Sequence, residues 1–188
     1  IKIGMVCDKD IALTIAQCIR KYRPKWVVYD PVMVSTSGHK LMTDDTIEVI
    51  KQELIPLATL ITPNLHEARI LSGLDLKHEG EMENCADVLG KTCGCSVLVK
   101  GGHLEDGEMC DVLYDADEQQ CFHYRAPKIE SHNLHGTGCT LSSAIATKLS
   151  QGHSLKGAIA LAKDYVTKAI DAAKDMHIGH GHGPLWHF

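Results

Sequence analysis

The segment Gly136-Thr137-Gly138-Cys139 carries the clearest chemical signal in the sequence, because it directly precedes a run of small and apolar residues with helical character. Glycines at a helix start leave backbone N–H groups free to face a ligand, and the positive helix end favours negative charge there. The same field favours the thiolate form of Cys139. An oxyanion cradle containing a base predicts phosphoryl or acyl transfer. The alternative is a glycine loop that only turns a strand sharply into a helix.

Asp30 lies directly after the short apolar run 26–29 and before Pro31. A carboxylate at the end of a buried strand suits Mg²⁺ or a magnesium-bound water. The alternative is that Asp30 caps the turn that leads into the proline.

Asn64 and Glu67 form an N-x-x-E pair at a predicted helix start. Asparagine at the N-cap with glutamate three residues later is a variant of the capping box. In the functional interpretation, Glu67 orders magnesium-bound water beside nucleotide phosphates. The two interpretations are compatible, because a capped helix start also fixes the carboxylate.

Lys100, Gly101 and Gly102 follow the predicted strand 97–99. The lysine can neutralise phosphate charge, and the glycines permit close approach of the backbone to a ligand. The alternative is an ordinary turn with a solvated lysine.

Alternating strands and helices are predicted along the chain, with an added hairpin. We expect strands at 1–6, 26–29, 58–62 and 97–99, hairpin strands at 111–114 and 120–125, and helices at 11–22 after Asp10, after Thr43, after Asn64, and at 81–92, 140–150 and 155–173. This order indicates a mostly parallel α/β sheet with helices on both faces and an antiparallel edge hairpin. Ligands bind beyond the carboxyl ends of such strands, so the four polar clusters should meet at one edge.

Composition excludes several classes of function. The net charge is -5 and no basic run occurs, which argues against nucleic acid as a partner. No apolar run is long enough to span a membrane. Eight cysteines without a CxxC pair predict free thiols in the reducing cytoplasm. Histidines 177, 180, 182 and 187 lack companion ligands, so we expect a glycine-rich tail packed on the sheet rather than a metal site.

Five segments together carry a resemblance to a known family. They are Asp30-Pro31-Val32-Met33 with Ser37-Gly38, residues 60–68, residues 99–103, residues 135–142 and residues 179–184. In order and spacing, from Ile1 to Phe188, the chain resembles the hydroxymethylpyrimidine/phosphomethylpyrimidine kinases, the thiamine-pathway branch of the ribokinase superfamily. Most of the superfamily has aspartate at the position of Cys139. In having cysteine there, the chain is similar to this branch and to some pyridoxal kinases.

The resemblance implies an ATP- and Mg²⁺-dependent kinase. It would phosphorylate the hydroxymethyl group of 4-amino-5-hydroxymethyl-2-methylpyrimidine and then the monophosphate. The resemblance implies a phosphoryl cradle at Gly136, Thr137, Gly138 and Cys139. It implies nucleotide binding at Lys100, Gly101, Gly102, Asn64 and Thr137. It also implies that Asp30 and Glu67 hold magnesium through water and that Met5, Val32 and Cys139 bind the pyrimidine. Cys139 would take the hydroxyl proton or serve only in the cradle. A homodimer is also implied.

The family begins with a strand, a glycine-rich segment and a covering flap, and none of these precedes Ile1. We therefore expect residues 1–188 to form the C-terminal part of a single ribokinase-like kinase domain that lacks its N-terminal strands. Two alternatives stay open: a pyridoxal kinase of the cysteine-bearing type, and a non-catalytic fragment that binds nucleotide without turnover.

Overall fold

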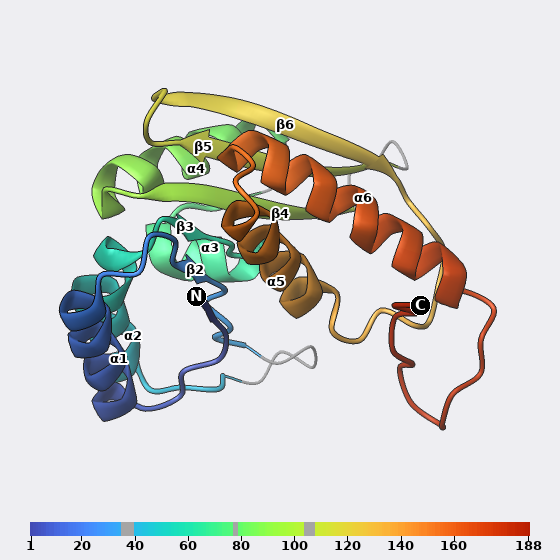
Figure 1. Cartoon of the computed structure of the whole chain (residues 1–188), viewed down its shortest axis with the longest axis horizontal. Coiled ribbons are helices and arrows are strands. Elements are labelled where there is room, and N and C mark those ends of the chain that lie inside the picture. The colour runs from blue at the N-terminus through green and yellow to red at the C-terminus, as the bar shows by residue number, and fades with distance from the viewer. Residues whose placement is uncertain (35–39, 77–78, 104–107) are drawn as a thin grey trace.

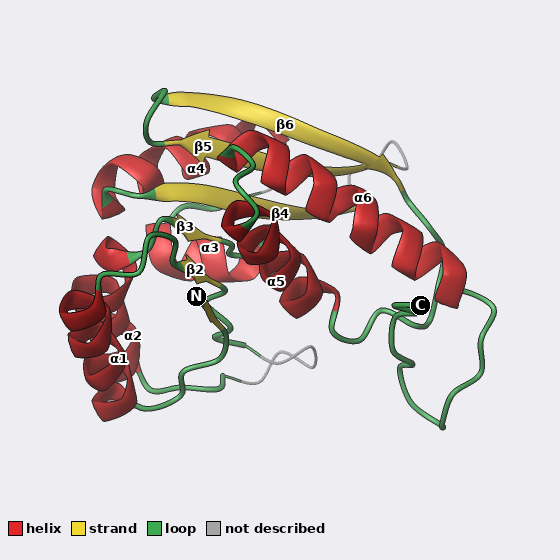
Figure 2. Cartoon of the chain, viewed as in Figure 1, coloured by secondary structure: helices red, strands yellow, loops and turns green. Residues whose placement is uncertain are grey.

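The computed structural model describes residues 1–34, 40–76, 79–103 and 108–188 of the chain. Its centre is a six-stranded sheet whose strands lie side by side in the order of the sequence (Figures 1 and 2). The strands are β1 (Lys2–Ile3), β2 (Val28–Tyr29), β3 (Leu60–Ile61), β4 (Ser96–His103), β5 (Glu108–Asp115) and β6 (Gln120–Pro127). Ser37 and Gly38 lie outside the described residues.

Strands β1 to β4 pair in parallel, and β4, β5 and β6 pair antiparallel. The predicted mostly parallel sheet with an antiparallel edge hairpin is therefore confirmed. The hairpin is longer than predicted because Glu108 pairs with Pro127 and Asp115 with Gln120, so the ladder covers all of β5 and β6.

Helices cover both faces of the sheet (Figure 1). One face carries α1 (Lys9–Tyr22), α2 (Asp44–Val49), α3 (Leu65–Ser72) and α4 (Glu79–Cys93). The other face carries α5 (Thr137–Ser150) and α6 (Leu155–Ala173). Helix α2 continues into a π-helical turn, Ile50–Leu54, and a 3₁₀ turn, Ile55–Leu57.

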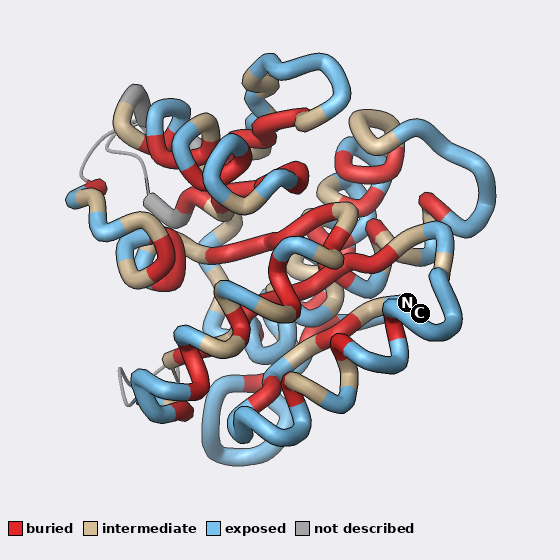
Figure 3. Tube along the Cα trace, turned by 90° about the vertical axis from the view of Figure 1, so that its left-hand side faces the viewer, coloured by how far each residue is buried: buried red, intermediate tan, exposed pale blue. Residues whose placement is uncertain are grey.

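Alternate residues of the strands supply two cores. Val28, Leu60, Leu98 and Leu113 face α5 and α6. Their neighbours Tyr29, Ile61, Val97, Val99 and Val112 face the other helices. Because side chains alternate along a strand, both faces bury apolar residues, and the buried strands run through the interior in Figure 3.

The first helix differs from its predicted form. It begins at Lys9, and Asp8 rather than Asp10 caps it, because the Asp8 carboxylate accepts the N–H groups of Asp10 and Ile11. The side of the helix that packs in the core carries Ala12, Ala16 and Ile19. Ile11, which begins the apolar i, i+4, i+8 series of Ile11, Ile15 and Ile19 in the sequence, is exposed at 50%.

Several other predicted boundaries were wrong by a few residues. Strands β1, β2 and β3 are shorter than predicted, whereas β4 extends to His103 because it has a long antiparallel partner in β5. Helix α4 begins at Glu79, before Gly80, and α5 begins at Thr137 rather than Thr140. The bounds of α6, the Thr43 cap of α2 and the Asn64 cap of α3 are confirmed.

The C-terminal tail packs on α6 and on the segment before α5, not on the sheet as predicted. His135 pairs with Pro184, and the Trp186 N–H donates to the Ala169 carbonyl of α6. The Asn133 amide donates to the Ala173 and Met176 carbonyls at the end of α6. This anchoring gives the tail a structural role. Within the described ranges, no cluster of three His, Cys, Asp or Glu residues is arranged to hold a metal ion. Nor does any helix there have the length and apolarity to cross a membrane.

Candidate active site

The start of helix α5 is an anion-binding geometry. Gly136 caps it with φ of 86°, a left-handed backbone that glycine adopts without strain. The Thr137 N–H bonds the Leu134 carbonyl at 3.3 Å, and the Thr140 N–H bonds the Gly136 carbonyl at 2.8 Å. The N–H groups of Gly138 and Cys139 have no acceptor among the described residues. Two unpaired donors at a positive helix end favour a bound anion.

A buried ion pair lies beside this helix start. Asp30, directly after β2, is 1% exposed, and the Lys100 Nζ is 2.7 Å from its Oδ1. Thr62 donates its hydroxyl to the same oxygen at 3.1 Å, and Ser142 of α5 donates to Oδ2 at 3.4 Å. Lys100 is therefore not a solvated turn lysine. Its charge is held at the sheet edge by a fully buried carboxylate.

Lys100 and the α5 helix start are in close contact. A methyl group built at Gly138 would lie 3.2 Å from the Lys100 Nζ and 3.7 Å from Asp30 Oδ2. The backbone of β4 also reaches the start of α3, because the Lys100 N–H donates to the Pro63 carbonyl and Lys100 pairs with Asn64. The predicted convergence of strand-end clusters at one sheet edge is thus confirmed.

Glu67 is held by its predicted capping box. The Asn64 side chain accepts the Glu67 N–H at 2.9 Å, and Glu67 Oε2 accepts the Asn64 N–H at 2.8 Å. Glu67 is 2% exposed, and this burial raises its pKa above the ordinary value, aided by the charge of Asp30 and opposed by the Asn64 N–H and Lys100. Burial and the charges of Glu67 and Asp30 also raise the pKa of the buried Tyr29 phenol.

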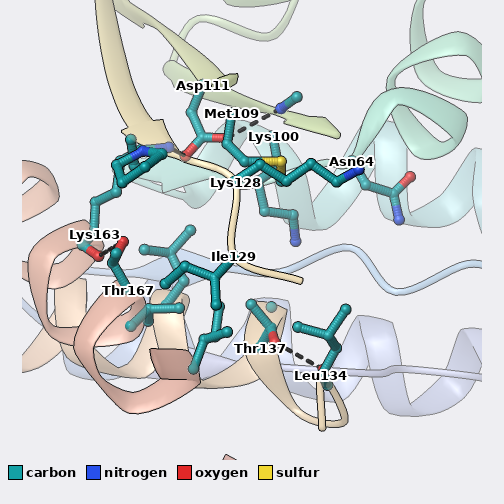
Figure 4. Close-up of a pocket in the computed structure, with 17 residues that line it drawn as sticks. Asn64, Lys100, Met109, Asp111, Lys128, Ile129, Leu134, Thr137, Lys163 and Thr167 are labelled. Atoms are coloured by element: carbon teal, nitrogen blue, oxygen red, sulfur yellow. Dashed lines mark hydrogen bonds and ion pairs between the residues drawn. The ribbon is translucent and has the colours of Figure 1, made fainter. Parts of the chain in front are cut away.

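Two cavities meet at Lys100. The first, here called the apolar pocket, has a volume of about 420 Å³ and lies between β4, β5 and β6 and helices α5 and α6 (Figure 4). Its walls include Met109, Ile129, Leu141, Val166 and Ile170.

The second, here called the open cavity, has a volume of about 820 Å³. It is lined by strand-end loops and helix starts that include Asp30, Val32, Glu67 and Cys139, and by His182 of the C-terminal tail. The two cavities share Asn64, Lys100, Leu134, Thr137 and Gly138.

The predicted site residues divide between these cavities. Four of the five predicted nucleotide ligands line the apolar pocket: Asn64, Lys100, Gly101 and Thr137. Gly102 lies in β4 beside them. Val32, Cys139, Asp30 and Glu67 line the open cavity, together with Gly136. Met5 is 57% exposed and lines neither cavity.

Sequence reasoning missed three charged residues of the apolar pocket, Asp111, Lys128 and Lys163. Lys163 Nζ lies 2.6 Å from Asp111 Oδ2, and both side chains are nearly buried. A signal was present, because Asp111 begins the predicted strand 111–114 and stands between Cys110 and Val112, where a buried aspartate needs a partner.

The sheet is open and mixed, and its carboxyl edge meets a glycine-capped helix, a lysine and two carboxylates. This arrangement places the chain in the ribokinase-like class of α/β proteins. It superimposes on the ADP complex of Bacillus subtilis pyridoxal kinase with a TM-score of 0.86 and 35% identity, over 99% of this chain and 68% of that one. A family model described as phosphomethylpyrimidine kinase matches residues 1–186, and the chain belongs to this family.

Two relatives show how much of a longer protein the chain corresponds to. It is 43% identical to the hydroxymethylpyrimidine/phosphomethylpyrimidine kinase of Rhizobium meliloti, covering 100% of this chain and 70% of the relative. It is 44% identical to a thiamine biosynthesis bifunctional protein of Geobacter sulfurreducens, covering 100% of this chain but 37% of that protein. The match therefore spans well under half of the bifunctional relative.

Proposed function

We propose that the protein transfers the terminal phosphoryl group of ATP to the hydroxymethyl group of 4-amino-5-hydroxymethyl-2-methylpyrimidine, and then a second one to the monophosphate. The family and the names of the relatives supply the substrate class. The observation that carries the proposal is the start of α5, where two unpaired N–H groups stand beside Lys100 between two cavities. A phosphoryl group at that point would be within reach of ligands in both.

The nucleotide belongs in the apolar pocket. Its aliphatic walls suit the faces of a purine ring, and its rim carries Lys100 and Thr137 next to the α5 helix start. Nucleotide phosphates leaving the pocket there meet a cation and free N–H donors, which stabilise charge on a transferring phosphoryl group.

The acceptor belongs in the open cavity, near Val32 and Cys139. The substrate oxygen forms a bond to phosphorus, the bond to the ADP oxygen breaks, and the hydroxyl proton passes to the Cys139 sulfur. A helix start favours a negatively charged group such as a thiolate. In the second transfer an oxygen of the monophosphate is the attacking atom and carries no proton that must be removed.

Asp30 and Glu67 fit a magnesium ion bound mainly through water. Both carboxylates are buried at the rim of the open cavity, but Lys100, Thr62 and the Asn64 N–H already occupy oxygens of theirs. Such a site offers no all-protein cage, as suits an ion that keeps waters and shares nucleotide phosphates. When bound, Mg²⁺ supplies neutralisation of phosphate charge.

The test is ADP release by the purified chain with ATP, Mg²⁺ and either the hydroxymethylpyrimidine or pyridoxal. We expect turnover with the pyrimidine to exceed turnover with pyridoxal. The structural likeness to a pyridoxal kinase makes the reverse preference the second candidate. If the chain binds ADP but forms no ADP from ATP with either substrate, it is a non-catalytic nucleotide-binding domain.

Two further expectations belong to this proposal. A homodimer is expected from the superfamily resemblance, and light scattering of the purified protein checks it. A cytoplasmic location is expected because the cysteines of the described residues form no disulfides, and fractionation of cells checks that.

A further inference from the structure

Asp111 and Lys163 form a nearly buried ion pair in the wall of the apolar pocket. Asp111 comes from β5 and is 6% exposed, and Lys163 comes from α6. The lysine donates to Asp111 Oδ2 at 2.6 Å. Figure 4 shows the two together at one edge of the pocket, with Leu134 and Thr137 across from them.

The other oxygen of Asp111 accepts a hydrogen bond where the ladder between β4 and β5 is interrupted. Lys100 pairs with Asp111 and His103 with Met109, so β4 has two residues between these pairs where β5 has only Cys110. The extra residue makes a bulge and disrupts the ladder there. The Gly101 N–H donates to Asp111 Oδ1 at 3.1 Å instead of to a strand carbonyl.

The bulge is held tightly on its other side. A methyl group at Gly101 would lie 1.9 Å from the Cys110 carbonyl oxygen and 2.8 Å from Met82 Cε. Backbone therefore packs on backbone, and only glycine fits. The direction in which the Gly101 N–H points is set by Asp111.

Asp111 needs a counter-charge to do this as a carboxylate. Burial raises its pKa, and Lys163 is the strongest influence that lowers it again. The pair also joins two elements, because α6 forms the pocket wall through Val166, Thr167 and Ile170. The ion pair thus ties this wall to the residue that follows Lys100.

We propose that Asp111 and Lys163 are a positioning pair that holds the β4 bulge, and with it Lys100 and Gly101, in the geometry that binds nucleotide. This inference rests on the proposed function in one respect, the presence of nucleotide in the apolar pocket. Lys163 acts on the nucleotide only through Asp111 and the bulge.

The first measurement is the exchange of the Gly101 amide with solvent deuterium, which requires no ligand. Lys163→Met should accelerate that exchange by about tenfold or more, since it leaves Asp111 buried without a counter-charge. Lys168→Met is the matched control, because Lys168 is on the same helix, is 75% exposed and, within the described part of the chain, pairs only with Asp164. It should leave Gly101 unchanged.

The second measurement is ADP affinity by calorimetry. Lys163→Met should weaken ADP binding by about tenfold, and Lys163→Arg and the control by less than about threefold. The double variant Lys163→Met/Asp111→Asn should recover both Gly101 protection and ADP affinity, because asparagine still accepts from Gly101 and needs no counter-charge. This recovery separates positioning from general loss of folding.

The outcomes are distinct. Weaker ADP binding with unchanged Gly101 exchange would mean that Lys163 contacts the nucleotide directly and would overturn the proposal. Faster exchange with unchanged ADP affinity would overturn it as well. A wild-type chain that binds no ADP contradicts the proposed function, while the exchange data still decide whether the pair holds the bulge.

Discussion

The apolar pocket and the open cavity share Lys100 and Gly138, yet they are built by different means. The walls of the apolar pocket are the antiparallel strands β4 to β6 and the two helices of that face, α5 and α6. The bulge in β4 is braced by the Asp111–Lys163 ion pair. The open cavity is made of residues that follow strands or begin helices, and Cys139 and His182 in it are exposed.

This difference separates two kinds of preorganisation. Ladder hydrogen bonds and helix packing fix the apolar pocket, so its shape is part of the fold. The open cavity depends on a few specific contacts, among them the capping box of Glu67 and the bonds to Asp30. Substitutions at the shared rim should therefore damage both sides, and substitutions in the open cavity should affect the acceptor, the magnesium ion and the chemistry but leave the walls of the apolar pocket intact.

Lys100→Met should have the largest effect, because Lys100 belongs to both cavities. We expect kcat/KM to fall by about 1,000-fold through lost stabilisation of phosphoryl charge, and the free energy of unfolding to fall by about 3 kcal/mol because Asp30 is left buried and unpaired. Steady-state kinetics and urea unfolding measure the two losses. A loss of stability with activity within tenfold would make Lys100 only the partner of Asp30.

Cys139→Ala should affect the chemistry in the open cavity and leave the apolar pocket unchanged. We expect kcat for the first transfer to fall by about 100-fold, the scale of a lost positioned base, with ADP affinity unchanged. Cys18→Ala, also exposed but on α1, is the matched control. Near-normal kcat in Cys139→Ala would restrict this residue to the anion cradle.

Glu67→Gln should separate magnesium use from stability. The amide keeps the capping contact, so we expect a several-fold higher Mg²⁺ requirement without unfolding. The pKa of Glu67 is raised above about 4.5 in the folded state, so its favourable contribution is present below that pH and is lost as pH rises through the folded-state value.

Thermal melts of wild type and Glu67→Gln from pH 4 to 8 should therefore diverge, with the variant the more stable of the two at neutral pH. A variant that melts earlier, with unchanged magnesium dependence, would leave Glu67 only its capping role.

Met5→Ala should have the smallest effect. Met5 was predicted to bind the pyrimidine, but it is 57% exposed and lines neither cavity. We expect the pyrimidine KM to change by less than about threefold, as for a surface substitution. Val32→Ala is the comparison, because Val32 does line the open cavity and should raise that KM more. An equal or larger effect at Met5 would contradict this boundary of the acceptor side.

Much of the site could be predicted because its residues follow strands directly. Asp30, Glu67 and Lys100 each stand at a change from an apolar run to polar residues, and parallel strands bring such positions to one edge. The partnership of Lys100 with Asp30 could not be predicted, since the two are 70 residues apart. Asp111 and Lys163 were missed for the same reason, being 52 residues apart.

The errors at element ends also have local causes. Ile11 fits an apolar i, i+4 pattern, but the packed helix buries Ala12 and Ala16 beside Ile19 and leaves Ile11 exposed. Strand β4 extends beyond its apolar stretch because pairing with β5 resumes at His103, after the bulge at the two glycines. Periodicity describes which residues can be buried, whereas caps and partners decide where an element starts and which face is buried.

The sequential order of the strands has a consequence for how the chain is made. Each strand pairs with the one synthesised just before it, so the sheet can grow in step with translation. Its second face cannot close at the same pace. Val28, Leu60, Leu98 and Leu113 stay uncovered until α5 and α6 emerge from the ribosome. During that interval the nascent sheet presents an apolar surface that a chaperone would recognise.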